Sequence, residues 1–146
     1  NPCHIPPFLN PKQFDKFYWP TYKKMVEYLH ENGGHMMTFC EGDWGPNIDH
    51  LADLPDNSVT FICPTERLLE IKKIAKNNSV MGGMPQAMLR DSTTKECIEH
   101  AKKIIDEVAP DGHFVFSTDK VLIAPSDAKI ENLRAVNEFV HTYGQY

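Results

Sequence analysis

The sequence predicts an α/β fold in which four parallel strands alternate with helices. Short apolar segments rich in β-branched and aromatic residues recur along the chain, and segments of helical periodicity lie between them. A further helical segment precedes the first strand. Because strands joined through helices need crossover connections, we expect a parallel sheet with right-handed crossovers. Two architectures fit this order: a small doubly wound sheet and the C-terminal half of a TIM (β/α)8 barrel.

The N-terminal part is expected to form one long helix after an irregular lead-in. Prolines recur in residues 1–9, which argues against regular structure there. The helix should begin at Asn10, an N-cap residue followed by proline at the first helical position. It should end at the glycine pair 33–34. Pro20 predicts a kink near Trp19.

The remaining predicted elements alternate between strands and helices. The strands are Met36–Cys40, Val59–Cys63, Val80–Met81 and His113–Ser117, and the helices are Asn47–Leu54, Glu66–Lys76, Thr93–Ala109 and Asn132–Tyr143. Thr93 and Glu96 form a capping box that opens the longest of these helices. The glycine pair Gly82-Gly83 is expected just after the third strand. It would form a tight turn there or admit a ligand close to the backbone.

Length, charge and cysteine usage restrict the class of protein. The 146 residues are expected to form one domain, and the chain starts without an initiator methionine, so we expect a fragment of a longer chain. A net charge of −5 without a basic block argues against nucleic-acid binding. No apolar run approaches the ~20 residues of a membrane span. Four widely spaced cysteines and no export signal predict reduced thiols and a cytoplasmic location.

The segment that follows the first predicted strand carries the strongest functional signal. Cys40, Glu41 and Asp43 lie where a parallel strand opens toward the ligand face of the fold. A thiol and two carboxylates would suit a metal ion or a cationic or hydroxylated ligand. The two carboxylates disfavour a phosphate, so a nucleotide is not expected. The alternative is structural, with Cys40 buried at a strand end and Asp43 capping a turn.

The end of the fourth predicted strand carries the second group of candidates. Ser117 and Asp119 should emerge at the same edge of the sheet as Cys40. We expect Asp119 to act with Glu41 and Asp43 as a catalytic carboxylate. Substrate-binding positions are expected at Gly82, Gly83 and Ser117, with Cys40 as the metal-binding position. A loop-capping role is the alternative for Asp119.

Several motifs, taken together in this order and spacing, resemble one enzyme family. They are Phe14-x-x-Phe17-Tyr18-Trp19-Pro20, Phe39-Cys40-Glu41-Gly42-Asp43-Trp44, Gly82-Gly83-Met84-Pro85, Gly112-His113-Phe114-Val115-Phe116-Ser117 and Glu131-Asn132-Leu133. This pattern over residues 11–144 resembles the C-terminal half of the uroporphyrinogen decarboxylase superfamily. It is most similar to the branch with cobalamin-dependent methyltransferases. Members are (β/α)8 barrels of more than twice this length, so the resemblance implies a half-barrel.

The resemblance implies corrinoid-dependent methyl transfer by the full-length protein. The corrinoid would be a substrate or a cofactor carried by a partner corrinoid protein, and a zinc ion would activate a thiol acceptor. Family members build this zinc site from a His-x-Cys and a later cysteine. Here Cys40 matches the first cysteine, while Thr38 and Ser117 stand at the other two ligand positions. By resemblance, Cys40, Glu41, Asp43, Ser117 and Asp119 line the pocket.

Two other functions stay open at this point. Uroporphyrinogen decarboxylation, a step of porphyrin synthesis, needs arginines that bind the carboxylates of its tetrapyrrole substrate. Arg67, Arg90 and Arg134 are expected on helices or distant loops. The third reading is a non-catalytic C-terminal domain or fragment, which the altered ligand positions and the missing half-barrel favour. On every reading the isolated chain is expected to be inactive.

A half-barrel should not remain alone in solution. Four strands leave two open edges and an apolar sheet face without a partner. We therefore expect the chain to pair with an N-terminal half-barrel or with a second copy of itself. Light scattering of the purified chain should then give twice the 16.7 kDa of one chain. A compact, stable monomer at micromolar concentration would contradict this expectation.

Overall fold

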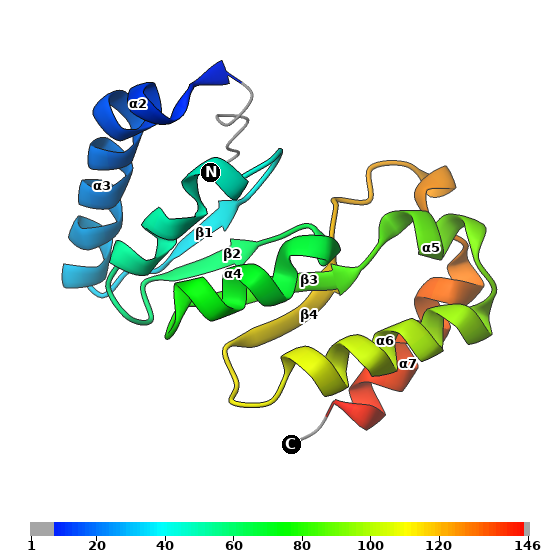
Figure 1. The fold of residues 1–146 in the computed structure, drawn as a ribbon. Coiled ribbons are helices and arrows are strands. Elements are labelled where there is room, and N and C mark those ends of the chain that lie inside the picture. The colour runs from blue at the N-terminus through cyan, green and yellow to red at the C-terminus, as the bar shows by residue number, and fades with distance from the viewer. Residues whose placement is uncertain (1–7, 145–146) are drawn as a thin grey trace.

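A computed structural model describes residues 8–144 as an α/β fold built on a four-stranded parallel sheet (Figure 1). The strands are β1 (Met36–Phe39), β2 (Val59–Ile62), β3 (Ser79–Met84) and β4 (Phe114–Thr118). Their spatial order is β1-β2-β3-β4, which is also their sequence order. A doubly wound sheet reverses its strand order at a switch point. The uninterrupted order therefore fits the predicted segment of a barrel.

The helices alternate with the strands largely as predicted. They are α2 (Pro11–Gln13), η1 (Phe14–Tyr18), α3 (Trp19–Glu31), η2 (Gly45–Asp53), η3 (Thr65–Arg67), α4 (Leu68–Ala75), α5 (Gln86–Asp91), α6 (Thr94–Val108), η4 (Pro125–Asp127) and α7 (Ile130–Tyr143). The short helices α5 and η4 were not predicted. Residues 1–7 of the expected lead-in lie outside the described residues. So does Cys3, one of the four expected thiols. The three described cysteines are free.

The first long helix contains a wide turn where the sequence predicts a kink. η1 is a turn of π-helix, and the Trp19 N–H donates to the Phe14 carbonyl five residues earlier. Pro20 lacks an amide hydrogen, so the α-helical bond to the carbonyl four residues before it cannot form. A widened turn in front of the proline accommodates this loss. The Asn10 side chain caps the start of the helix, as predicted.

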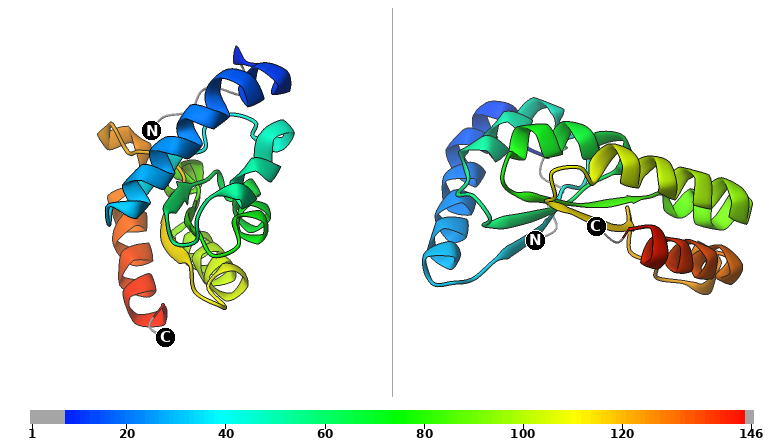
Figure 2. Two further views of the ribbon diagram at one scale, coloured as in Figure 1. Left: turned by 90° about the vertical axis from the view of Figure 1, so that its left-hand side faces the viewer. Right: turned by 90° about the horizontal axis from the view of Figure 1, so that it is seen from below.

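The strand register assigns side chains to the two faces of the sheet. Thr38, Phe61 and Val80 lie side by side in one row and are fully buried. The Tyr22 hydroxyl of α3 lies 2.6 Å from Thr38 Oγ1, and α4 and α6 pack against β3. In Figure 2, α4 and α6 lie on this side of the sheet, and α3 and α7 lie at its two ends. This face is the covered face.

The opposite face of the sheet, here called the open face, is apolar and incompletely covered. Its central row contains Phe39, Ile62, Met81 and Val115, which the register places next to one another. Val115 is 47% exposed, and Met37 on the same face is 50% exposed. Phe39, Ile62 and Met81 are half-buried. A partly exposed apolar row of this kind fits the inner face of a half-barrel.

The glycine pair of β3 lies inside the strand, not after it. β3 extends to Met84, whereas the sequence predicted only Val80–Met81, followed by a turn. A Cβ atom at Gly82 would meet the Cys63 carbonyl oxygen at 2.7 Å, and one at Gly83 would meet Ile104 Cγ2 at 2.6 Å. Both residues also have positive φ angles. Close packing between β2, β3 and α6 therefore requires glycine at both positions.

A buried asparagine ties the N-terminal ends of two strands together. Asn78 Oδ1 accepts the Ser58 and Val59 N–H groups, both at 2.9 Å, and its Nδ2 donates to the Pro55 carbonyl. These bonds satisfy backbone groups that would otherwise be buried without partners. The edge of the sheet at the strand N-termini therefore contributes to stability. Among the described residues, no helix combines the length and apolar character needed to cross a membrane.

Lys76 adopts a backbone conformation that costs stability. It follows α4 with φ +52° and ψ −108°, and its side chain is exposed. Only glycine adopts such angles without strain. We predict that Lys76→Gly raises the free energy of unfolding by about 1 kcal/mol. Glycine relieves the backbone strain of the folded state, and this gain exceeds the loss caused by the greater conformational freedom of the unfolded chain. Urea denaturation measures this change.

Lys73→Gly is the matched control, because it removes the same charge from an exposed position inside α4. It should lower the free energy of unfolding by about 1 kcal/mol. Loss of stability in both variants would contradict the strained conformation at Lys76.

Candidate functional site

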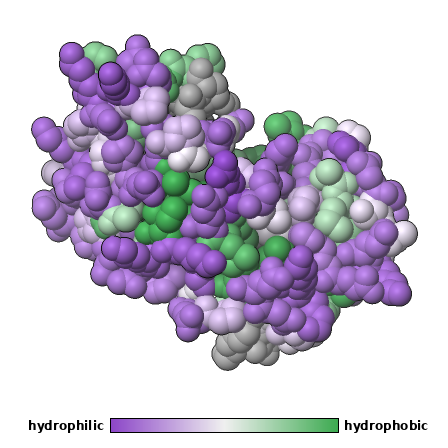
Figure 3. Space-filling model, viewed as in Figure 1, coloured by the Kyte–Doolittle hydropathy of each residue, from purple (hydrophilic) through white to green (hydrophobic). Residues whose placement is uncertain are grey.

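A cavity of about 1110 Å³ lies at the edge of the sheet where the strands end. The loops after β1, β2 and β4 supply its wall, including Glu41, Asp43, Arg67, Asp119 and Lys120. The space-filling view is hollowed between the lobe with α2 and α3 and the lobe with α5 to α7 (Figure 3). Of the predicted site residues, the structure therefore brings Cys40, Glu41, Asp43 and Asp119 to one cavity.

Asp43 and Arg67 join two loops of the cavity wall. Asp43 Oδ1 accepts the Gly45 N–H at 2.9 Å and the Arg67 Nη2 donor at 2.7 Å. Arg67 Nη1 donates to Glu70 Oε2 at 2.8 Å. Glu70, and to a lesser degree Asp43, raises the pKa of Arg67 above its usual value. A Cβ at Gly45 would lie 3.2 Å from the guanidinium, so this position favours glycine.

Arg67 lies on a helix, as predicted, but this helix brings it to the cavity. Arg67 ends η3, directly after β2, and borders the cavity. Its position four residues beyond the predicted strand Val59–Cys63 was the available signal, because strand C-termini face the ligand side. Arg90 pairs with Asp91 on α5 instead.

Two aspartates hold the loop that follows β4. Asp119 Oδ1 accepts the Gln86 N–H at 2.9 Å, and its own N–H donates to the Met84 carbonyl. Asp127 Oδ2 accepts the N–H groups of Ile123 and Ala124 at 2.7 and 2.9 Å. The Ala124 and Ile123 N–H groups lower the pKa of Asp127. The predicted capping role of Asp119 is therefore present alongside its place in the cavity wall.

The loop anchored by these two aspartates gives the cavity an apolar rim. Val121 and Ile123 are 63% and 88% exposed and both border the cavity. Large apolar side chains at this exposure favour contact with a ligand or a partner over contact with water.

The other predicted substrate-binding residues lie elsewhere. Ser117 pairs with Gly83 inside the sheet and borders a separate cavity of about 170 Å³ next to α7. Gly82 and Gly83 are buried within β3. The structure therefore does not bring these three residues into the wall of the large cavity. Their proposed role in substrate binding stays a prediction.

The charges around the large cavity are mainly negative. Five carboxylates border it, namely Glu41, Asp43, Glu66, Asp119 and Asp127, against two cations, Arg67 and Lys120. A wall of this composition repels polyanions and suits neutral or cationic small molecules.

The residues at the zinc-ligand positions of the resembling methyltransferases do not assemble a zinc site. Thr38 is buried and hydrogen-bonded to Tyr22, and Ser117 lies at the separate cavity. Residues 8–144 contain no group of three or more His, Cys, Asp or Glu side chains that is arranged to hold a metal. Catalytic zinc uses three protein ligands and an open position. The family arrangement therefore does not fit this chain.

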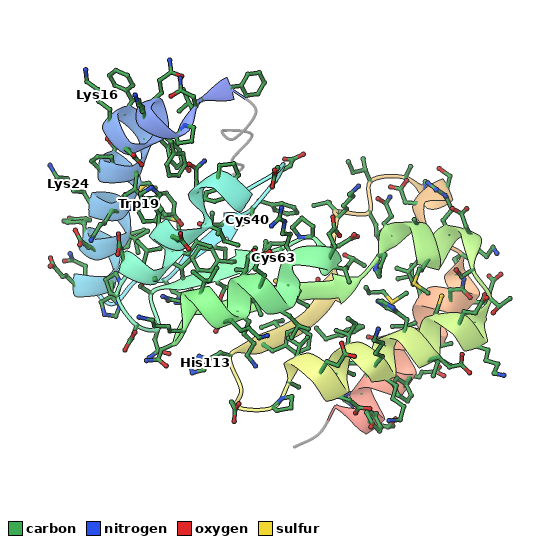
Figure 4. All side chains as sticks on the ribbon, in the orientation of Figure 1. Lys16, Trp19, Lys24, Cys40, Cys63 and His113 are labelled. Carbon is green, nitrogen blue, oxygen red and sulfur yellow. The ribbon has the colours of Figure 1, made fainter. Side chains whose placement is uncertain are left out.

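Cys40 is the predicted metal-binding residue, and it lies against a second thiol. Cys40 and Cys63 follow β1 and β2 and are 1% and 0% exposed (Figure 4). The neighbouring Cys63 thiol, and next to it burial, raises the pKa of Cys40. His113 lies at the opposite end of the sheet, away from both thiols (Figure 4).

Removing the guanidinium should release the loop after β1. In Arg67→Met the Asp43 carboxylate loses one of its two partners, so the Gly45 N–H should exchange with solvent about three- to tenfold faster. Hydrogen–deuterium exchange of the segment 40–45 measures this rate. Arg90→Met is the control, because it breaks a similar exposed pair on α5. Unchanged exchange at Gly45 in Arg67→Met would show that the ion pair does not hold the loop.

Comparisons with known proteins agree with this architecture. The family model for uroporphyrinogen decarboxylase (URO-D) matches residues 5–143. A solved methyltransferase from Methanosarcina mazei superposes with a TM-score of 0.70 at 14% identity, covering 96% of this chain and 40% of that one. The chain thus spans well under half of that structure. A search of curated proteins finds no match. The family match extends over nearly the whole chain, which therefore belongs to the uroporphyrinogen decarboxylase family.

Proposed function

We propose that this chain is the C-terminal half of a methyltransferase that moves a methyl group between a small substrate and a corrinoid. The observation that carries the proposal is the mainly acidic cavity at the C-terminal edge of the sheet. In barrel enzymes this edge holds the active site. Membership of the family and the fold shared with a solved methyltransferase add support.

Charge favours methyl transfer over decarboxylation. Uroporphyrinogen carries many carboxylates, and five carboxylates already border this cavity. Arg67 is the specific feature that keeps decarboxylation as the second candidate function, because a guanidinium binds carboxylates well. However, Arg67 already contacts Asp43 and Glu70, which compensate its charge. A neutral or cationic methyl donor meets no such repulsion.

The carboxylates of the wall would then have different roles. Glu41 is proposed to contact the substrate and to deliver the proton that the leaving heteroatom needs when its methyl group departs. Asp43 would position Glu41, since its bonds to Arg67 and Gly45 hold the same loop. Asp119 would complete the wall from the loop after β4 and orient the Gln86 amide. A corrinoid bound at this edge or carried by a partner would accept and return the methyl group at its cobalt.

An N-terminal half-barrel is the partner that the open face fits best. The row of Phe39, Ile62, Met81 and Val115 is apolar and extends across all four strands. Burying such a row against the inner face of four further strands would close the sheet and remove both edges. A second copy of the chain is the alternative partner. Either partner would also supply the part of the cavity wall that these loops leave open.

The proposed role of Glu41 can be tested in the assembled protein. Glu41→Gln keeps the size of the side chain and removes its proton-transfer chemistry. In the direction from methylcobalamin to an added thiol, the thiol sulfur takes the methyl group and Glu41 would take up the thiol proton. The rate of methylcobalamin demethylation by this thiol, followed by its visible absorption, should fall about a hundredfold. Glu99→Gln on the exposed side of α6 is the control and should leave the rate unchanged.

Full activity of Glu41→Gln would refute its assignment. If the assembled protein left methylcobalamin untouched but released carbon dioxide from uroporphyrinogen, decarboxylation would replace methyl transfer as the function.

A further inference from the structure

A row of exposed lysines follows the outer side of the first long helix. Lys12, Lys16 and Lys24 are spaced by multiples of four residues along α2, η1 and α3, and all three are exposed. The opposite side of α3 carries the buried residues Trp19 and Tyr22. In Figure 4, Lys16 and Lys24 accordingly point away from the sheet. These three lysines are called the basic row.

The charges of the basic row are not balanced by other side chains of residues 8–144. None of the ion pairs in this part of the chain includes one of the three lysines. By contrast, three lysines of α6 pair with carboxylates four residues further along their helix. Four residues beyond Lys12 the sequence has Lys16 instead of a carboxylate. Asp15 lies between them, but its carboxylate contacts His50.

This arrangement is electrostatically unfavourable for the helix alone. Like charges four residues apart on a helix repel each other, as Lys12 and Lys16 do. Lys12 also lies in the first turn, where the helix dipole disfavours a cation, and this turn contains no acidic residue. A negatively charged partner lying over the row would relieve both repulsions. The charges therefore predict a partner that is an anion.

Exposed aromatic rings accompany the basic row. Phe17 is 62% exposed, and Lys16 Nζ lies 5.1 Å from the centroid of its ring. Tyr28, four residues after Lys24, is 66% exposed. Aromatic side chains are enriched in the cores of protein–protein interfaces. The surface therefore offers apolar contacts beside its charges.

We propose that the basic row docks an acidic segment of a partner protein. A helix rises about 1.5 Å per residue, so the row from Lys12 to Lys24 is about 18 Å long. An extended segment of about six residues covers this length. Its carboxylates would pair with the lysines, and its apolar side chains would pack on Phe17 and Tyr28. The proposal does not depend on methyl transfer.

Charge and packing favour an acidic protein segment over a nucleic acid or a membrane. Glu27 and Glu31 lie toward the end of α3, and the whole chain has a net charge of −5. Both features repel a longer polyanion. The apolar side of α3 packs into the core through Trp19, Tyr22 and Val26, so it is not free to enter a membrane. The half-barrel partner proposed above would pack on the open face and leave the row accessible.

A short acidic peptide is the direct probe. We expect a capped hexapeptide of four glutamates and two leucines to shift the amide signals of residues 11–28 in the isotope-labelled protein. In Lys12→Gln/Lys16→Gln the Kd for this peptide should rise about fivefold, because two exposed charge contacts are lost. Added salt should weaken binding to the wild-type protein, since it screens such contacts. A peptide with glutamine in place of glutamate should not bind.

Lys95→Gln/Lys103→Gln is the matched control, because it removes the same charge from exposed positions on α6. It should leave the Kd for the acidic peptide unchanged. Equal weakening in both double variants, equal binding of the glutamine peptide, or shifts centred outside residues 11–28 would each overturn the proposal. Tighter binding of a thymidine hexanucleotide or of phosphatidylserine vesicles would overturn the assignment to a protein partner. Full activity of Glu41→Gln would count against its catalytic role and leave this proposal intact.

Discussion

The in-register pairing of four parallel strands determines where everything else in this molecule lies. The strands pair in sequence order, so their C-terminal ends all reach one edge of the sheet. The loops that follow them supply the carboxylates and cations of the large cavity. The same register turns Thr38 and Phe61 toward the helices and Phe39 and Ile62 toward the open face. It also places Cys40 beside Cys63.

The covered face and the open face of the sheet have different roles, the first in stability and the second in association. The covered face carries its stability, through the packing of Gly82 and Gly83 against β2 and α6 and through the bond between Tyr22 and Thr38. The open face favours association with a partner, because no layer of the described residues covers its apolar row. The cavity lies at the C-terminal ends of the strands. On the proposed function, the active site would therefore be completed only in an assembly larger than this chain.

The sequence predicted the repeating elements but not the contacts between them. Period and capping signals act over a few residues, so the longer helices and three of the four strands were recognisable. β3 was predicted too short, because Gly82-Gly83 signals a turn locally, whereas pairing with β4 continues the strand to Met84. The bond between Asp43 and Arg67 spans 24 residues, which no local pattern encodes.

The central claim is that ligands bind at the C-terminal edge of this sheet. Amide chemical shifts of the isotope-labelled protein, recorded while methylcobalamin is added, test it most directly. The account predicts shifts confined to residues 39–43, 64–67, 86 and 119–127, which contain the cavity wall. Shifts centred on the strand N-termini, around residues 56–58 and 76–78, would contradict it, as would the absence of any shift at saturating ligand.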